Sequence, residues 1–383
     1  MAEFVLGAHA AVYLEPRVSG RFRLVRYDEA MTLTRASAVR REVQDSPDYP
    51  FAPIEARVKL DQNESAHDFP TKLKRLALER LEKLEWNRYP DLHTDTLREK
   101  IADFEDWQPK GVVVTPGSNV LIHALAQIAG INQRVLTVSP SFSLYALGAK
   151  LLGSSLKELP LEPGFELPMN GLLRELRAGG PGIVYLAEPH APTGALHPLE
   201  RLERICAAAG SDWLVVIDEA YHGFSARDHK ALVRAHANVC ILRTFSKAWG
   251  LAGARLGYLL AQPELAANVQ KVVSPFNVSH LNAIVAEVAL EHPQYMQSRL
   301  EEVKTERERV YRKLLEHPTW TVYPSHANFL LFRTPDAKTA HAGLLSHGVL
   351  VRRQDSYPGL EGCLRVSVGK PEENTAFLEA AFS

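Results

Sequence analysis

Residues 244–258 read Thr244-Phe245-Ser246-Lys247-Ala248-Trp249-Gly250-Leu251-Ala252-Gly253-Ala254-Arg255-Leu256-Gly257-Tyr258, a run in which one lysine stands among small and apolar residues. Hydroxyl groups flank Lys247 at Thr244 and Ser246, and Arg255 follows eight positions later. A lysine in such surroundings can lose its proton and form a Schiff base with a carbonyl compound. Because hydroxyls and a guanidinium are natural ligands of a phosphate dianion, the run predicts a site that holds an amine beside a phosphate.

An acidic turn follows one of the apolar runs. Residues 213–217 are apolar throughout and lead into Asp218-Glu219-Ala220-Tyr221. A carboxylate at the end of a buried strand is costly unless it meets a cation or a metal ion, so Asp218 is either a functional residue or half of a structural salt bridge. The same pattern describes the magnesium-binding strand of P-loop nucleoside triphosphatases, but the G-x-x-x-x-G-K-[ST] motif of those proteins occurs nowhere in the sequence.

A turn at Thr115-Pro116-Gly117-Ser118-Asn119 opens a predicted helix directly after a predicted strand. Free amides at a helix start, with the helix dipole behind them, form an anion site, and Gly117 lets a phosphate approach the backbone. An ordinary N-cap would explain Ser118 equally well. Alone, this turn is therefore a weak indication of phosphate binding.

Short β-branched runs alternate with segments of helical periodicity between residues 111 and 261. The predicted strands are residues 112–115, 134–138, 183–187, 214–217, 238–242 and 256–261, and helical spacing is clear in 118–129 and 198–208. This alternation predicts an α/β fold with a mostly parallel sheet covered by helices on both faces. In such a sheet ligands bind beyond the carboxyl ends of the strands, which is where the three motifs above lie.

The pattern changes beyond about residue 262. Long charged helices such as 297–316, followed by short strands around 329–332 and 363–368, predict a smaller α+β domain. The expected domains are a flexible N-terminal extension at 1–45, an N-terminal segment at 46–85 that contributes to the small domain and the dimer interface, a large domain at 86–270 and a small domain at 271–383.

The overall composition narrows the class of protein. Lys and Arg number 44 against 45 Asp and Glu, so there is no excess of positive charge to hold a nucleic acid. No apolar run reaches the roughly 18 residues of a membrane-spanning helix, and Glu3 stands where a signal peptide should be basic. The cysteines Cys206, Cys240 and Cys363 lie far apart and in no zinc-ligand spacing. We therefore expect a cytoplasmic protein with no metal, membrane or nucleic-acid partner.

The ordered set of motifs, together with Pro192-Thr193-Gly194, resembles the fold-type I pyridoxal-phosphate (PLP) aminotransferases over most of the chain. The resemblance implies that PLP is the cofactor, that Lys247 bonds to it and that Asp218 partners its pyridine nitrogen. Tyr221 would hydrogen-bond its phenolic oxygen, and Phe142 would stack on its ring. The groups implied for its phosphate are Gly117, Ser118, Asn119, Thr244, Ser246 and Arg255.

Other segments resemble one subfamily, the histidinol-phosphate aminotransferases. Asn87-Arg88-Tyr89-Pro90-Asp91 is similar to the segment that crosses the dimer interface there, where Tyr89 would touch the cofactor phosphate of the neighbouring subunit. The resemblance therefore implies a homodimer with shared active sites.

The implied substrate ligands lie near the two ends of the chain. Arg365 matches a substrate-binding arginine general to the superfamily, and Arg352 matches an additional arginine that the subfamily uses on the substrate phosphate. Two guanidinium groups converging on one spot suit a dianion or a carboxylate, although Arg352 could instead be a surface residue. Asn63, in Asn63-Glu64-Ser65, and Tyr49 are further matches.

One departure from the family pattern concerns the cofactor. The chain reads Glu188-Pro189-His190-Ala191-Pro192-Thr193-Gly194, and Ala191 stands where an asparagine usually donates a hydrogen bond to the phenolic oxygen. The loss of such a donor costs about 1.5 to 3 kcal/mol if nothing replaces it. Tyr221 alone could carry the role, or His190 could replace the donor.

The resemblance implies transamination between histidinol phosphate and 2-oxoglutarate, giving imidazole-acetol phosphate and glutamate, in histidine biosynthesis. The alternatives are an aromatic or broad-specificity aminotransferase and a PLP-dependent decarboxylase of threonine phosphate. A PLP-binding sensor within a transcription regulator is disfavoured, because the first 45 residues are too short and unpatterned for a winged helix.

Overall fold

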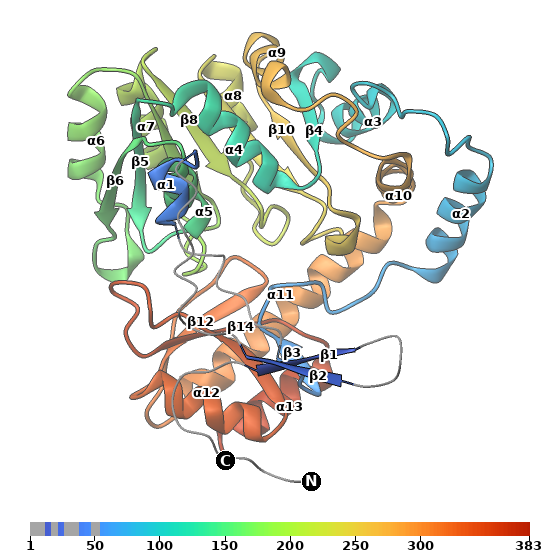
Figure 1. The fold of residues 1–383 in the computed structure, drawn as a ribbon. Coiled ribbons are helices and arrows are strands. Elements are labelled where there is room, and N and C mark those ends of the chain that lie inside the picture. Colours follow the sequence, from blue (N-terminus) through green and yellow to red (C-terminus); the bar gives the residue numbers. More distant parts are fainter. Residues whose placement is uncertain (1–11, 17–21, 27–37, 47–53) are drawn as a thin grey trace. The chain divides into compact units, whose positions relative to one another are not determined.

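The structure, a computed structural model, describes residues 12–16, 22–26, 38–46 and 54–383 (Figure 1). The chain forms two compact units, Met1–Asp48 and Tyr49–Ser383. In the first unit β1 (Val12–Pro16) pairs antiparallel with β2 (Phe22–Arg26), and α1 covers Arg41–Gln44. The prediction of a flexible extension at 1–45 falls largely on residues outside the described ranges, and so does the prediction for Tyr49.

A seven-stranded sheet forms the large part of the second unit, in the order β4-β10-β9-β8-β7-β5-β6 (Figure 1). All neighbouring pairs are parallel except those of β10, which runs antiparallel to both β4 and β9. The strands are β4 (Val112–Thr115), β5 (Arg134–Ser139), β6 (Ser155–Pro160), β7 (Gly182–Ala187), β8 (Trp213–Asp218), β9 (Val239–Thr244) and β10 (Gly257–Leu260).

Each face of this sheet has its own hydrophobic core, because successive strand residues point to opposite faces. Val112 and Val114 belong to one core and Val113 to the other. The helices that contribute to the first core include α3 (Asp95–Glu105), α6 (Met169–Arg177), α7 (Leu199–Ala209), α8 (Lys230–Ala235) and α10 (His280–Glu291). Those of the second core are α4 (Ser118–Ala129), α5 (Ser143–Leu151) and α9 (Pro263–Val272).

A five-stranded sheet in the order β11-β12-β14-β13-β3 forms the smaller part. Its strands are β3 (Val58–Leu60), β11 (Thr321–Val322), β12 (Phe329–Arg333), β13 (Val349–Arg353) and β14 (Cys363–Ser367). The chain reaches this sheet twice, because β3 precedes the large sheet and pairs parallel with β13 from the C-terminal part. The remaining helices are α2 (Thr71–Glu82), α11 (Gln294–Leu315), α12 (Ala337–Ser346) and α13 (Pro371–Ala381), and short 3₁₀ turns cover Pro109–Gly111, Pro163–Phe165 and Ala252–Ala254.

The predicted fold class is confirmed. The six predicted strands of the large sheet are present within two residues of their expected ends, and the helix at 118–129 has the expected bounds. The sequence pattern missed β6, an edge strand that contains Lys157 and Glu158 and whose side chains are mostly exposed. None of the described helices is long and apolar enough to cross a membrane.

Candidate active site

The carboxyl ends of β4 and β9 lie on either side of Gly257, which pairs with Thr115 in β4 and Thr244 in β9. A Cβ atom at Gly257 would lie 2.3 Å from the amide nitrogen of Ser118, so only glycine lets β10 pass this close to the start of α4. The turn at 115–119 and the run at 244–258 are therefore brought together at one edge of the sheet, where a parallel α/β sheet binds its ligands.

A positively charged cradle lies at the start of α4. Gly117 has a φ of +87°, and a Cβ atom there would lie 2.7 Å from Nη2 of Arg255. Nη1 of Arg255 is 3.4 Å from the hydroxyl of Ser246. The amides of Ser118 and Asn119 belong to the first helical turn, where amides have no acceptor within the helix. A cation, a hydroxyl and helix amides at one spot suit a phosphate.

Thr244 lies at the same edge, but its hydroxyl is engaged within the loop. The hydroxyl donates to the carbonyl of Leu256 (3.1 Å) and accepts a hydrogen bond from the amide of Ser246 (3.1 Å). These bonds fix the turn that presents Ser246 and Lys247. The structure thus favours a part for Thr244 in shaping the loop.

Asp218 ends β8 as a buried carboxylate. Tyr145 in α5 donates its hydroxyl to Oδ2 (2.7 Å), and the amide of Ala220 donates to Oδ1 (3.0 Å). Burial raises the pKa of Asp218 to about 6, although the two hydrogen bonds oppose the change. A positively charged partner would relieve the cost of this buried charge, and a protonated pyridine nitrogen is such a partner. The sequence pattern missed Tyr145, because its contact with Asp218 spans 73 positions.

Lys247 lies close to loops that follow strands of both the large and the small sheet. Its Nζ donates to the backbone carbonyl of Gln62 (2.9 Å) and lies 6.0 Å from the centre of the Tyr221 ring. Burial of the amine, followed by the charges of Arg365 and Arg255, lowers the pKa of Lys247 to about 8. Near neutral pH an appreciable share of the amine is therefore unprotonated, the form that attacks a carbonyl carbon.

Tyr221 is buried beside Lys247 and is held by the N-terminal segment. Nδ2 of Asn63 donates to its hydroxyl oxygen (2.8 Å), and its ring packs edge-on against Phe329 with 5.1 Å between centroids. Asn63, a candidate for substrate binding, thus lies in the cluster of candidate site residues around Lys247. Both polar atoms of its side chain are engaged, however, with Tyr221 and with Ser367.

Arg352 and Arg365 are directly opposite each other on β13 and β14. Directly opposed residues of an antiparallel pair project from the same face, and like charges there are destabilising. Arg365 donates to the carbonyl of Asp61 (3.0 Å), and its guanidinium carbon lies 5.3 Å from the centre of the Phe329 ring. Since Phe329 contacts Tyr221, this pair of arginines faces the cluster around Lys247.

Phe142 precedes α5 and is half-buried. Its ring is edge-on to that of Tyr145, with 5.7 Å between centroids, so it lies next to the residue that binds Asp218. Tyr89 has a different environment: it is 81% exposed and stacks on Phe276, which is itself 40% exposed, with 4.8 Å between centroids. The described contact of Tyr89 is therefore with an exposed aromatic ring outside the cluster.

The segment that departs from the family pattern is buried. Ala191 is 8% exposed, and Nδ1 of its neighbour His190 lies 2.8 Å from the hydroxyl of Thr193. Burial, together with the nearby His197, lowers the pKa of His190 to about 3, so its ring is neutral. His197 in turn pairs with Glu188, another buried residue. The hydrogen bond of His190 to Thr193 gives this histidine a partner within its own turn.

A buried network of charges lies behind Asp218, and the sequence pattern did not indicate it. Nε of Arg243 donates to Glu219 (2.7 Å), and Nη1 donates to Glu105 at the end of α3. His229 lies 2.6 Å from Glu219, and Tyr258 donates its hydroxyl to Glu105. The network joins α3, β9 and β10 with Glu219, the residue that follows Asp218 at the end of β8.

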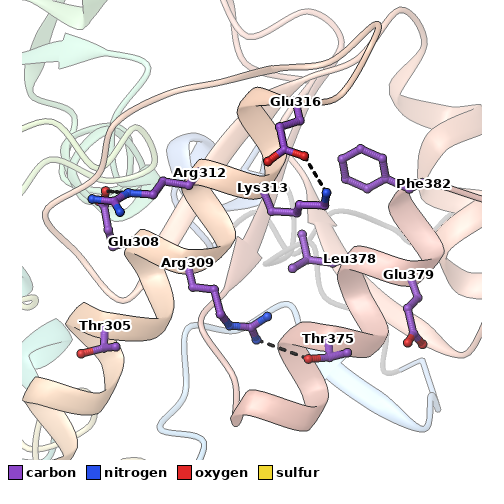
Figure 2. Close-up of a pocket in the computed structure, with 10 residues that line it drawn as sticks. All are labelled: Thr305, Glu308, Arg309, Arg312, Lys313, Glu316, Thr375, Leu378, Glu379 and Phe382. Carbon is purple, nitrogen blue, oxygen red and sulfur yellow. Dashed lines mark hydrogen bonds and ion pairs between the residues drawn. The ribbon is translucent and has the colours of Figure 1, made fainter.

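A separate groove of about 900 Å³ lies between α11 and α13 (Figure 2). Four of its charged side chains form two pairs: Arg312 bonds Glu308 (2.6 Å) and Lys313 bonds Glu316 (2.6 Å). It contains none of the residues predicted to bind cofactor or substrate. Among the described residues, no group of three or more His, Cys, Asp or Glu side chains is placed to hold a metal ion.

The family model for aminotransferases of class I and II matches residues 55–380, which include every described part of the cluster. The chain therefore belongs to this family of aminotransferases. It is an enzyme whose cofactor is PLP, and the residues present fit that cofactor. The cradle of Gly117 and Arg255 suits its phosphate, Asp218 suits its ring nitrogen and the amine of Lys247 suits its aldehyde.

Two of its relatives carry the same name. The chain is 52% identical over 345 residues to a histidinol-phosphate aminotransferase of Deinococcus radiodurans, a match that covers 90% of this chain and 96% of that protein. It is 38% identical to a second histidinol-phosphate aminotransferase, from Thermococcus gammatolerans, over 86% of this chain and 93% of that protein. The solved structure of histidinol-phosphate aminotransferase from Sinorhizobium meliloti, in complex with pyridoxal-5'-phosphate, has the same fold, with a TM-score of 0.82 at 24% identity over 92% of this chain and 98% of that one.

Proposed function

We propose that this aminotransferase interconverts histidinol phosphate plus 2-oxoglutarate and imidazole-acetol phosphate plus glutamate, a step of histidine biosynthesis. The observation that carries the proposal is that Arg352 and Arg365 lie directly opposite each other on one sheet face, on the side of Phe329, whose ring contacts Tyr221. Two guanidinium groups on one face suit an anion. A phosphorylated substrate and a dicarboxylate are both such anions. The names of the relatives, which match almost the whole chain, support the same substrate.

The residues of the cluster divide the work of transamination. When bound, the cofactor supplies an electron sink for the carbanion that forms at the substrate's α-carbon. Asp218 keeps the positive charge at the ring nitrogen. In return, that charge opposes the effect of burial and lowers the pKa of Asp218 again. Lys247, with its lowered pKa, is the group that takes and returns the proton of the substrate's α-carbon, as a general base and acid.

The two arginines bind the ends of the substrates. Arg365, fixed by the carbonyl of Asp61, holds a carboxylate of glutamate or 2-oxoglutarate. Arg352 holds the phosphate of histidinol phosphate. Guanidinium groups bind both anions with paired hydrogen bonds, so one pocket accepts the two substrates in turn.

Replacing Arg352 with alanine should raise KM for histidinol phosphate by about 10- to 100-fold. This change corresponds to the free energy, about 1.5 to 3 kcal/mol, of a hydrogen bond to a charged group. KM for glutamate should change by less than about threefold, because its carboxylate is held by Arg365. The measurement is steady-state kinetics of the PLP-loaded protein in both directions. The matched control is Arg353→Ala, which removes the adjacent, exposed arginine that pairs with Asp355 (2.6 Å) and should leave both KM values unchanged.

The same assay tests the substrate. With 2-oxoglutarate as acceptor, histidinol phosphate should be preferred over phenylalanine, and threonine phosphate should release no carbon dioxide. A preference for phenylalanine would show an aromatic aminotransferase instead, and carbon dioxide from threonine phosphate would show a decarboxylase. If Arg352→Ala raised KM equally for histidinol phosphate and glutamate, Arg352 would not be the ligand of the substrate phosphate.

We further propose a homodimer in which Tyr89 reaches the neighbouring active site. Tyr89, Phe276 and Trp86 are 81%, 40% and 69% exposed, and aromatic rings are enriched in the buried centres of interfaces. Sedimentation of the full chain should give twice the mass of one chain, and Trp86→Glu with Phe276→Glu should weaken the association. A monomeric wild type would contradict the proposal.

The proposed compartment is the cytoplasm. Cys206, Cys240 and Cys363 are free and buried, which fits a reducing environment. Recovery of the activity in a membrane or secreted fraction of the source cells would contradict this assignment.

A further inference from the structure

Three consecutive residues after β3 each hold a different residue of the active site. The carbonyl of Asp61 accepts from Arg365 (3.0 Å), and the carbonyl of Gln62 accepts from Nζ of Lys247 (2.9 Å). The side chain of Asn63 donates to the hydroxyl oxygen of Tyr221 (2.8 Å). The first two contacts use the backbone carbonyls of Asp61 and Gln62, whereas the third uses the side chain of Asn63. Of the three residues, only Asn63 can therefore be tested by a substitution that leaves the backbone unchanged.

Asn63 is itself fixed by hydrogen bonds to two residues of the C-terminal part of the chain. It is 1% exposed and has a left-handed φ of +53°, a conformation that asparagine tolerates better than most residues. Its amide donates to the hydroxyl of Ser367 (2.8 Å), and its carbonyl accepts from Asn328 (3.1 Å). These two bonds fix the backbone of Asn63 against Ser367 in β14 and against Asn328, which directly precedes β12.

The hydrogen-bond direction within this group can be assigned. Since the hydroxyl of Ser367 accepts from the amide of Asn63, the hydrogen of Ser367 is available for Oδ1 of Asn63, which lies 3.1 Å away. Oδ1 therefore faces Ser367, and Nδ2 faces Tyr221 as a donor. A donor at the oxygen of Tyr221 makes that oxygen the acceptor, so the hydroxyl hydrogen of Tyr221 does not point to Asn63.

We propose that Asn63 is a positioning residue, which orients the hydroxyl of Tyr221 so that Tyr221 donates its hydrogen to the phenolic oxygen of the cofactor bound at Lys247. The inference deepens the proposed function but depends only on the cofactor. It also explains how the site works with Ala191, whose methyl group cannot donate a hydrogen bond. The direction of the single hydroxyl of Tyr221 then matters more, and Asn63 sets it.

Asn63→Asp tests the direction of the bond. The substitution keeps the size and the acceptor toward Ser367 but places an acceptor, in place of a donor, against Tyr221. Tyr221 should then donate to the new carboxylate and turn its hydrogen away from the cofactor. A donor to the phenolic oxygen withdraws negative charge, so its loss should make the neighbouring nitrogen more basic.

The readout is the pH titration of the absorbance band of the lysine-bound cofactor, measured without substrate. The apparent pKa should rise by about one unit in Asn63→Asp, and by a similar amount in Tyr221→Phe. In the double variant Asn63→Gly with Tyr221→Phe the shifts should not add, because both substitutions remove the same hydrogen bond and neither adds a charge. The charged groups around Lys247, namely Arg365, Arg255 and Glu64, are unchanged in these proteins, and the new carboxylate of Asn63→Asp adds its own charge to the rise.

Asn63→Gly is the second variant, because glycine adopts the same backbone conformation without strain and simply removes the donor. It should give a smaller rise than Asn63→Asp. The matched control is Asn132, an exposed asparagine with a φ of +55°, whose Asp and Gly variants should leave the titration unchanged. Thermal unfolding of each protein checks that it is folded.

An unchanged titration in a folded Asn63→Asp protein, or shifts that add in the double variant, would overturn the proposal. Because no substrate is present, these outcomes do not depend on whether histidinol phosphate is the substrate. The preference among substrates in the wild type tests that question separately.

Discussion

Replacing Lys247 with alanine should lower kcat/KM by at least about 10⁴-fold, because one substitution removes both the amine proposed to bond to the cofactor and the proposed general base for the α-proton. The wild-type protein should carry the cofactor covalently after borohydride reduction, and the modified peptide should contain Lys247. The variant should bind the cofactor without this bond, since the cradle of Gly117 and Arg255 remains.

The control for this prediction is Lys230→Ala. The ammonium of Lys230 is held by Asp228 (3.3 Å) and Glu105 (3.4 Å), so the residue is structural. Its removal should lower stability but leave borohydride fixation at Lys247 intact. Transamination retained in Lys247→Ala would contradict the assignment of Lys247 as the cofactor-bonding amine and general base.

The lowered pKa of Lys247 extends the same prediction to pH. Only the neutral amine attacks an aldehyde, so the rate at which the cofactor-free protein takes up PLP covalently should rise with pH through about 8 and level off above it. An ordinary lysine would keep gaining up to its usual value of 10.5. Arg365→Met removes one of the charges that lower the pKa, so its inflection should lie at a higher pH.

Much of this cluster could be predicted from the sequence, because its residues follow strands of a recognisable pattern. Lys247, Asp218 and Gly117 stand in local motifs, and a parallel sheet brings the ends of its strands together whatever the order of the strands. The family resemblance is confirmed by the family model and by the relatives. The roles of the individual residues stay predictions.

What the sequence could not show depends on contacts across long separations. The carbonyls of Asp61 and Gln62 hold Arg365 and Lys247, but a backbone carbonyl leaves no trace in the residue type. Asn63 was placed by resemblance as a substrate ligand, whereas its hydrogen bonds run to protein groups. The antiparallel direction of β10 was also hidden, since a fully buried strand has the same apolar pattern in either direction.

The buried charges around Arg243 are the clearest case, because Glu105 stands 138 positions earlier in the chain. Arg243 is 1% exposed and bonds both Glu105 and Glu219, which are 2% and 1% exposed. Arg243→Leu removes the cation that the two buried carboxylates share, and leaves Glu105 with Lys230 as its ion-pair partner (3.4 Å). The free energy of unfolding should fall by about 3 to 5 kcal/mol, as measured by urea titration of the PLP-saturated protein.

The matched control is Arg312→Leu, the same substitution in an ion pair whose side chains are 75% and 53% exposed. Exposed pairs contribute little, so its cost should be below about 1 kcal/mol. Similar losses in the two variants would show that burial of the network adds nothing.

The pH dependence of stability should reverse between wild type and Arg243→Leu. Burial alone would raise the pKa of Glu219, but the charge of Arg243 and the hydrogen bond from His229 outweigh it and lower the pKa to about 2. In the wild type the contribution of Glu219 is therefore complete above its ordinary pKa of 4.5 and is lost as the pH falls toward 2. Without Arg243 burial dominates and the folded state prefers the protonated acid, so acidification from pH 7 to 5 should narrow the difference in stability between the two proteins. A difference that stays constant or widens over that range would mean that Glu219 does not depend on Arg243 for its charge.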